Sequence, residues 1–146
     1  MIAYLKGKLA YKDRAHVIID VQGVGYDVKI SLQTYDSLSE GDENCKLFTH
    51  LQIKEDAHTL VGFYEMDEKL LFLDLISVSG VGASTARMML SGMRPDEIIR
   101  AIVHGDARQL EQIKGIGKKS AERLVLELRD KLSKIPLNAH QLTGGG

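Results

Sequence analysis

An internal repeat constrains the fold of this chain more than any other feature of its sequence. Residues 75–90 align with residues 110–125 at an offset of 35, and four of the sixteen aligned positions are identical: a leucine, two glycines and an alanine. Each copy reads as a helix, a Gly-hydrophobic-Gly turn and a second helix. The repeat therefore predicts two helical hairpins in the second half of the chain.

The four glycines of these turns suggest why the pattern is repeated. Glycine takes tight backbone conformations that are closed to other residues, and without a Cβ it lets a partner approach the main chain closely. We expect both properties at Gly80, Gly82, Gly115 and Gly117. The residue between each pair, Val81 or Ile116, is expected to anchor its turn in the core.

Each turn opens a helix, whose unpaired N–H groups and positive dipole end bind anions. A phosphate is the natural anion, and two copies could hold two phosphates of one DNA duplex. The alternative is two packed helical hairpins that bind no ligand. A single copy of the repeat would fit that alternative as well as it fits phosphate binding. The predicted DNA-binding residues are Ser79, Gly80, Gly82, Ser84, Lys114, Gly115, Gly117, Lys118, Lys119, Ser120 and Arg123.

The charge distribution agrees with a local DNA-binding surface. The chain has 19 Lys and Arg against 20 Asp and Glu, a net charge of -1, which excludes a polybasic protein that binds through bulk charge. Residues 1–64 carry 7 basic and 9 acidic groups (net -2), whereas residues 110–134 carry 7 and 4 (net +3). The basic excess lies around the second turn, where phosphate contacts need it. A solvated helix face explains Arg129, Lys131 and Lys134 equally well.

The first half of the chain has the pattern of a small β domain. Five short β runs separated by turn signals predict a barrel or sandwich, with the OB fold as the leading candidate. The runs are residues 2–11, 16–21, 26–30 (after a turn at 23–25), 46–54 and 58–64. Residues 31–41 suit one or two helical turns, and the last two runs form a hairpin around residues 55–57. A β domain that serves only as a scaffold is the alternative to a binding platform.

After residue 64 the hydrophobic period changes to that of a helix. We expect Pro95 to begin one helix and Gly105 to end it, Asp106 to cap the next, and a last helix to run from about Lys118 to Leu132. The predicted fold class is α+β, a five-stranded OB-like barrel followed by an all-α domain with tandem helix-hairpin-helix motifs. The predicted limits are 1–64 for the barrel, 65–135 for the helical domain and 136–146 for a flexible linker.

Several classes of protein are not supported by the sequence. No apolar run is long enough to span a bilayer, and the single cysteine, Cys45, fits a reducing compartment, so we expect a cytoplasmic protein without a membrane partner. The scattered histidines predict no metal site, and we expect no cofactor. The run from Gly117 to Ser120 lacks the spacing of a phosphate-binding ATPase loop. A helix-hairpin-helix DNA glycosylase would need a catalytic Asp farther from the hairpin than Asp130, so no catalytic residue is predicted.

Shorter motifs throughout the chain carry a resemblance to a known family. They include Leu5-Lys6-Gly7, Gly23-Val24-Gly25-Tyr26, Phe48-Thr49-His50, Glu55-Asp56-Ala57 and Leu90-Ser91-Gly92-Met93. Together with the two Gly-x-Gly turns, they make the chain similar to the RuvA family from residue 1 to about residue 132. Members of that family are the Holliday-junction-binding subunits of the bacterial RuvAB branch-migration machine.

The resemblance implies a non-catalytic subunit that acts in recombination, DNA repair and the SOS response. It implies a homotetramer that holds a four-way junction open and square, with the hairpins on minor-groove phosphates and an acidic pin, matching Glu55 and Asp56, at the junction centre. It also implies the RuvB ATPase as a partner, with the RuvC resolvase as a further candidate. The RuvB contact is expected in a third helical domain beyond the end of this chain.

Three features of the sequence allow more than one interpretation. The first turn continues as Ala83-Ser84, where the resemblance leads us to expect a basic residue near position 84. Without the resemblance, Glu55 and Asp56 would be read as an ordinary exposed hairpin turn. Another OB and helix-hairpin-helix module that selects a DNA structure, or a scaffold that binds only protein, would share parts of the pattern.

Overall fold

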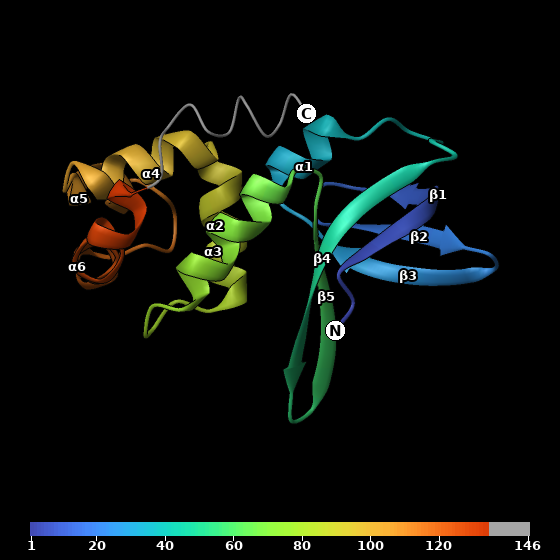
Figure 1. The fold of residues 1–146 in the computed structure, drawn as a ribbon, viewed down its shortest axis with the longest axis horizontal. Helices are drawn as coiled ribbons and strands as arrows, with labels where there is room; N and C mark the ends of the chain where they lie inside the picture. The colour runs from blue at the N-terminus through green and yellow to red at the C-terminus, as the bar shows by residue number, and fades with distance from the viewer. Residues whose placement is uncertain (135–146) are drawn as a thin grey trace. The chain divides into compact units, whose positions relative to one another are not determined.

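A computed structural model describes residues 1–134 of the chain. They form two compact units that divide between Lys69 and Leu70, coloured blue to green and green to red in Figure 1. The predicted domain limits at residues 64 and 135 stay predictions, and the predicted linker, 136–146, lies outside the described residues. Among the described residues no helix combines the length and the apolar character that crossing a membrane requires.

The first unit is a closed five-stranded barrel, which confirms the predicted fold class. Its strands are arranged in the order β1-β2-β3-β5-β4, with β3 and β5 parallel and β1 and β4 closing the barrel. The strands are β1 (Tyr4–Lys12), β2 (His16–Val21), β3 (Val24–Lys29), β4 (Cys45–Lys54) and β5 (Ala57–Phe63). A short helix, α1 (Leu32–Ser37), lies between β3 and β4 in the chain.

Alternating apolar residues of the strands fill the barrel. Side chains at every second position point inward, because successive residues of a strand face opposite sides. The buried cluster consists of Leu5, Leu9, Val17, Ile19, Val28, Cys45 and Leu47 from the strands, together with Ile30 and Leu38 from the segments beside α1. The strands predicted as short β runs thus each bury one face in the core.

The turn between β2 and β3 lies one residue earlier than the sequence analysis predicted. Val21 pairs with Val24, so the two-residue turn consists of Gln22 and Gly23, with φ of +52° and +92°. Positive φ at both central residues matches the right-handed twist of a tight hairpin. Gly25 therefore belongs to the strand, and the prediction of a turn over residues 23–25 was wrong at its last two positions.

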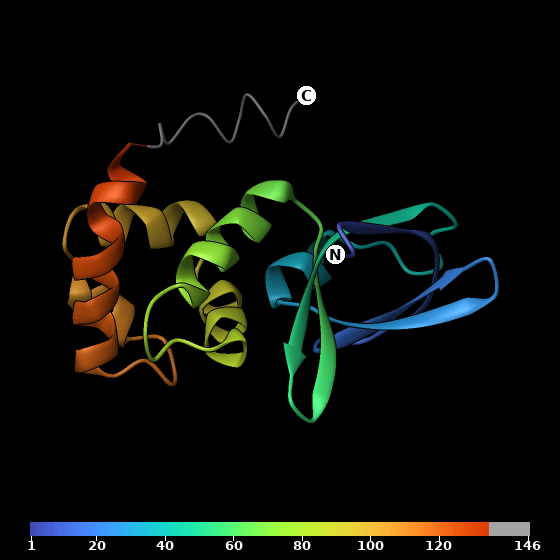
Figure 2. The same ribbon diagram turned by 60° about the horizontal axis from the view of Figure 1, so that its bottom comes forward.

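The second unit consists of helices. The helix α2 (Met66–Ile76) begins in the first unit and continues into the second. It is followed by α3 (Ala83–Gly92), α4 (Pro95–Val103), α5 (Ala107–Glu111) and α6 (Lys118–Ser133) (Figure 2). Their fully buried side chains include Met89, Leu90, Ile98, Ile102, Leu110 and Leu124.

The predicted helix ends of this unit are confirmed. Pro95 is the first residue of α4, Gly105 follows its end with φ of +70°, and Asp106 caps α5 by accepting from the Gln109 N–H at 3.2 Å. At the start of α4 the Arg94 N–H donates to Glu97 Oε1 at 3.1 Å.

A buried carboxylate ties α1 to the first turn of α2. Glu68 is 2% exposed, and it accepts hydrogen bonds from Ser31 Oγ at 2.5 Å and Thr34 Oγ1 at 2.6 Å. The Tyr64 N–H donates to Thr34 Oγ1 at 3.1 Å, so the same cluster holds the end of β5. Burial raises the pKa of Glu68, although the two hydroxyl donors oppose the shift. The cluster explains why the first turn of α2 belongs to the barrel unit.

We expect this carboxyl to give the fold a stability that decreases as pH rises. The pKa of Glu68 is raised on folding, so its contribution is fully present below about pH 4.5, the unfolded value, and is lost as pH rises through the folded value. Glu68→Gln cannot titrate at this position. The free energy of unfolding of the native chain, relative to that variant, should therefore fall as pH rises above about 4.5. Urea denaturation measures both proteins, and parallel pH profiles would contradict the expectation.

Candidate nucleic-acid interface

The two predicted hairpins share one backbone conformation. The first glycine of each turn lies in the left-handed region, with φ of +89° at Gly80 and +93° at Gly115. The second glycine is extended and caps the following helix, with φ and ψ of -91° and 176° at Gly82 and of -89° and 177° at Gly117. The repeat in the sequence is therefore a repeat in structure.

The hydrogen bonds of the turns also repeat at the offset of 35 residues. The Val81 N–H donates to the Val78 carbonyl at 3.0 Å, as Ile116 does to Ile113, also at 3.0 Å. The first bond of the following helix runs from Ala86 to the Gly82 carbonyl at 2.9 Å, and its counterpart in the second copy is 3.0 Å. As predicted, Val81 and Ile116 are buried, each 5% exposed. These bonds and anchors fix the direction in which each second helix begins.

The two glycines of a turn have different roles, which the sequence analysis did not foresee. Gly80 and Gly115 need positive φ, which side chains with a Cβ rarely adopt. Gly82 and Gly117 have a conformation that any residue adopts, so the prediction that all four glycines take conformations closed to other residues was wrong for these two. A Cβ at either position would meet no atom within 4 Å.

Because glycine is the cap, no cap side chain accepts a hydrogen bond from the first-turn amides of α3 or α6. In α5, by contrast, the Asp106 carboxylate fills that role. The helix starts after Gly82 and Gly117 therefore present bare amides and a positive dipole end at an open position of the backbone. This arrangement can receive an anion at each hairpin.

The two hairpins contact each other through equivalent positions. Arg123 Nη1 of the second copy donates to the Ser79 carbonyl at 3.2 Å and lies 3.7 Å from where a Cβ of Gly80 would be. Met88, which aligns with Arg123 in the first copy, has its sulfur 3.1 Å from where a Cβ of Gly115 would be. Each second helix thus contacts the turn of the other copy. Met88 was missed by the sequence analysis, and its alignment with Arg123 was the signal available.

The basic side chains near the second hairpin divide into two groups. Lys114, Lys118 and Lys119 are exposed, and within residues 1–134 the structure gives them no ion pair. Others are held inside the unit. Arg129 Nε donates to the Val103 carbonyl at 3.1 Å, and Lys131 lies 2.6 Å from the Asp74 carboxylate.

The remaining predicted residues lie at exposed or half-exposed positions of their elements. Ser84 is exposed in the first turn of α3. Ser120 of α6 follows the position that aligns with Ser84, and it is half-exposed. Glu55 and Asp56 are exposed at the tip of the hairpin between β4 and β5, where Lys54 pairs with Ala57. That hairpin belongs to the barrel unit. No cluster of three or more metal-ligating side chains occurs in the part of the chain that the structure describes.

Comparison with known proteins identifies the family. The family model described as the RuvA N terminal domain matches residues 1–62, and the model described as a SAM-like helix-hairpin-helix tandem matches residues 72–130. A RuvA protein of Cytophaga hutchinsonii is 50% identical over 139 residues, which cover 95% of this chain and 69% of that protein. The chain belongs to the RuvA family.

Other RuvA proteins support the same assignment. The protein of Flavobacterium psychrophilum is 53% identical over 135 residues, covering 92% of this chain and 69% of its own length. That of Neisseria meningitidis serogroup B is 48% identical over 145 residues, covering 99% and 72%. All three relatives are named Holliday junction branch migration complex subunit RuvA. The resemblance drawn from the motifs is confirmed.

Proposed function

We propose that this RuvA-family chain binds four-way junction DNA and serves as a non-catalytic subunit of a branch-migration complex. The observation that carries the proposal is the second glycine of each hairpin. Neither its backbone conformation nor any neighbouring atom requires glycine at Gly82 or Gly117. The missing Cβ therefore leaves the main chain open to a partner, and bare helix-start amides suit a phosphate.

The lysines around the second hairpin support DNA as the source of that phosphate. Lys118 and Lys119 are the first two residues of α6, directly after the capping Gly117, and Lys114 precedes the turn. These lysines flank the amides that would receive the anion, and a lysine that neutralises a phosphate releases the counterions condensed on DNA. Two hairpins in mutual contact suit two phosphates of one duplex arm. The proposed DNA-binding residues are those predicted from the sequence.

Arg123 also has a structural role in this interface. Its guanidinium donates a hydrogen bond to the Ser79 carbonyl and lies 3.8 Å from Glu127 Oε2. We therefore assign it first to holding the two turns together and only secondarily to phosphate contact. A half-exposed guanidinium keeps other N–H groups available for that contact.

The assembly proposed for the chain follows its family. Four copies hold the junction open and square, the RuvB ATPase supplies the motor, and the RuvC resolvase is a further candidate partner. The proposed site of action is the cytoplasm. Names of the relatives support a complex for branch migration, and the individual partners are part of the proposal.

The first test removes two charges from the start of α6. Lys118→Ala with Lys119→Ala should weaken binding to a synthetic four-way junction and reduce the slope of log affinity against log salt by roughly 0.9 for each phosphate that is no longer neutralised. A matched control, Lys131→Ala with Lys134→Ala, removes the same charge from the other end of the same helix and should leave the slope nearly unchanged. Fluorescence anisotropy at several salt concentrations gives both slopes, with duplex and single-stranded DNA as comparison ligands. Equal slopes for the native chain and the first variant would refute the proposal.

The second test concerns the acidic hairpin tip. We propose that Glu55 and Asp56 separate strands by repelling phosphates at the junction centre. Since a carboxylate near phosphates opposes binding, Glu55→Gln with Asp56→Asn should bind junctions at least as tightly as the native chain, while branch migration driven with RuvB changes. Both side chains are exposed, so the fold should be unaffected. Weaker junction binding by this variant would contradict the assigned role.

A further inference from the structure

The two hairpins are alike in backbone and unlike in charge. In the second copy the helix after the turn carries three cations, Lys118, Lys119 and Arg123. The aligned positions of the first copy are Ala83, Ser84 and Met88, none of which is charged. Both turns nevertheless have the open second glycine and bare first-turn amides. The first copy therefore supplies none of these cations from its own helix, and Arg123 of the second copy, which reaches the Ser79 carbonyl of the first turn, is shared with that carbonyl and with Glu127.

The first copy itself has one further cation near its turn. Arg87 is the only Lys or Arg between residues 77 and 93. It follows Ser84 by three positions in α3, and residues three apart are neighbours on a helix surface, with Cβ atoms about 5 to 6 Å apart. Helical side chains point back toward the helix N-terminus, so a long side chain covers the turn before its own Cα. The Arg87 guanidinium can thus reach the amides that follow Gly82.

The surroundings of Arg87 give it no internal counter-ion. Its side chain is half-buried, and burial alone lowers the pKa of its guanidinium, with no carboxylate to offset the effect. In residues 1–134 the structure gives its guanidinium neither an ion pair nor a hydrogen bond, and the Ser91 hydroxyl donates to the Arg87 backbone carbonyl. A cation that has lost water without gaining an anion is unfavourable in the free protein and is stabilised when an anion binds.

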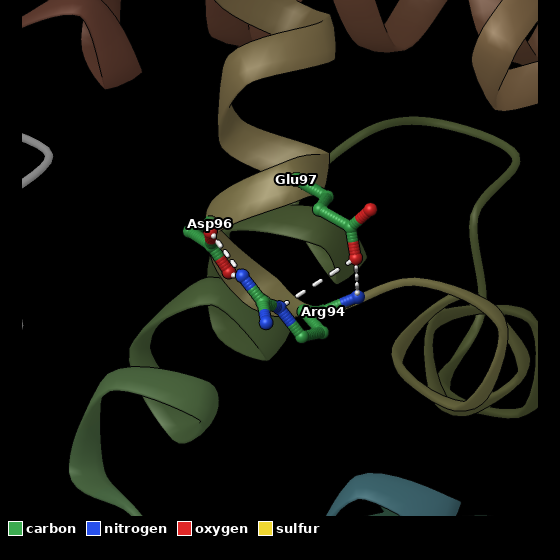
Figure 3. Close-up of polar contacts among 3 residues, drawn as sticks. All are labelled: Arg94, Asp96 and Glu97. Carbon is green, nitrogen blue, oxygen red and sulfur yellow. Dashed lines mark hydrogen bonds and ion pairs between the residues drawn. The ribbon is translucent and has the colours of Figure 1, made fainter.

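Arg94, just beyond the same helix, provides the contrast. Its guanidinium is 3.0 Å from Asp96 Oδ2 and 3.7 Å from Glu97 Oε1, and its backbone N–H also donates to Glu97 (Figure 3). Arg94 is therefore neutralised at the start of α4. Two arginines of one unit, seven residues apart, differ in whether the protein itself supplies their anion.

We propose that Arg87 is a phosphate-contacting cation that the first hairpin supplies from its own helix, in place of a basic residue at position 84. The inference rests on the proposed DNA-binding function and adds one residue to its binding surface. The guanidinium approaches from the second turn of α3, and the Gly82 position leaves the main chain open to the same phosphate. The two hairpins then hold their phosphates with different side chains on the same backbone.

The test removes the charge and then restores it one turn earlier. Arg87→Gln should weaken junction binding about tenfold, the effect of losing one charge-assisted hydrogen bond, and should lower the salt slope by about 0.9. Adding Ser84→Lys to Arg87→Gln should recover most of the slope. Arg94→Gln is the matched control and should leave affinity and slope unchanged. Thermal unfolding checks each variant, and Arg87→Met, which keeps an apolar stem, replaces the glutamine variant if that one does not fold.

Each other outcome overturns the inference. If Arg87→Gln keeps the native slope while Lys118→Ala with Lys119→Ala lowers it, Arg87 does not contact phosphate and the proposed function stands. If Ser84→Lys fails to restore the slope, Arg87 acts through the structure of α3 and not through its charge. If the lysine variant and Arg87→Gln both bind like the native chain, the proposed function fails together with the inference.

Discussion

The positive φ of Gly80 and Gly115 is the constraint on which the DNA-binding unit depends. The left-handed backbone conformation at those residues turns the chain sharply. Val81 and Ile116 can therefore enter the core, while the glycine after each of them stays exposed. The helix that follows then begins at a fixed place with an open glycine as its cap. The first glycine of each turn thus serves the fold, and the second is free to serve a ligand.

The contact between the hairpins extends this constraint to the whole unit. Arg123 and Met88 lie at aligned positions, and each meets the turn of the other copy. A left-handed turn without a side chain leaves room for that approach. One small set of contacts thereby holds the two proposed phosphate-binding positions relative to each other. This favours simultaneous binding of two phosphates, because the two positions are already oriented when the protein folds.

Much of this could be predicted from the sequence, for reasons that particular residues make clear. The run of β-branched residues in β2 and the paired glycines of the repeat are local patterns, so they gave the strand and the turns directly. The role of Glu68 could not be predicted, because its hydrogen-bonding partners, Ser31 and Thr34, lie more than thirty residues away in the chain. The ordinary conformation of Gly117 was missed since sequence does not distinguish a glycine needed for φ from one needed for space.

The central claim is that the open cap glycine serves a bound phosphate and not the fold, and Gly117→Asp tests it most directly. The backbone at Gly117 suits an aspartate cap, whose carboxylate would accept from the first-turn amides and favour the dipole by about 0.5 kcal/mol. The account predicts a free energy of unfolding equal to or above the native value, with junction affinity reduced at least tenfold. Gly117→Asn, a neutral cap, should bind with intermediate affinity. Native junction affinity for a well-folded Gly117→Asp chain would contradict the account.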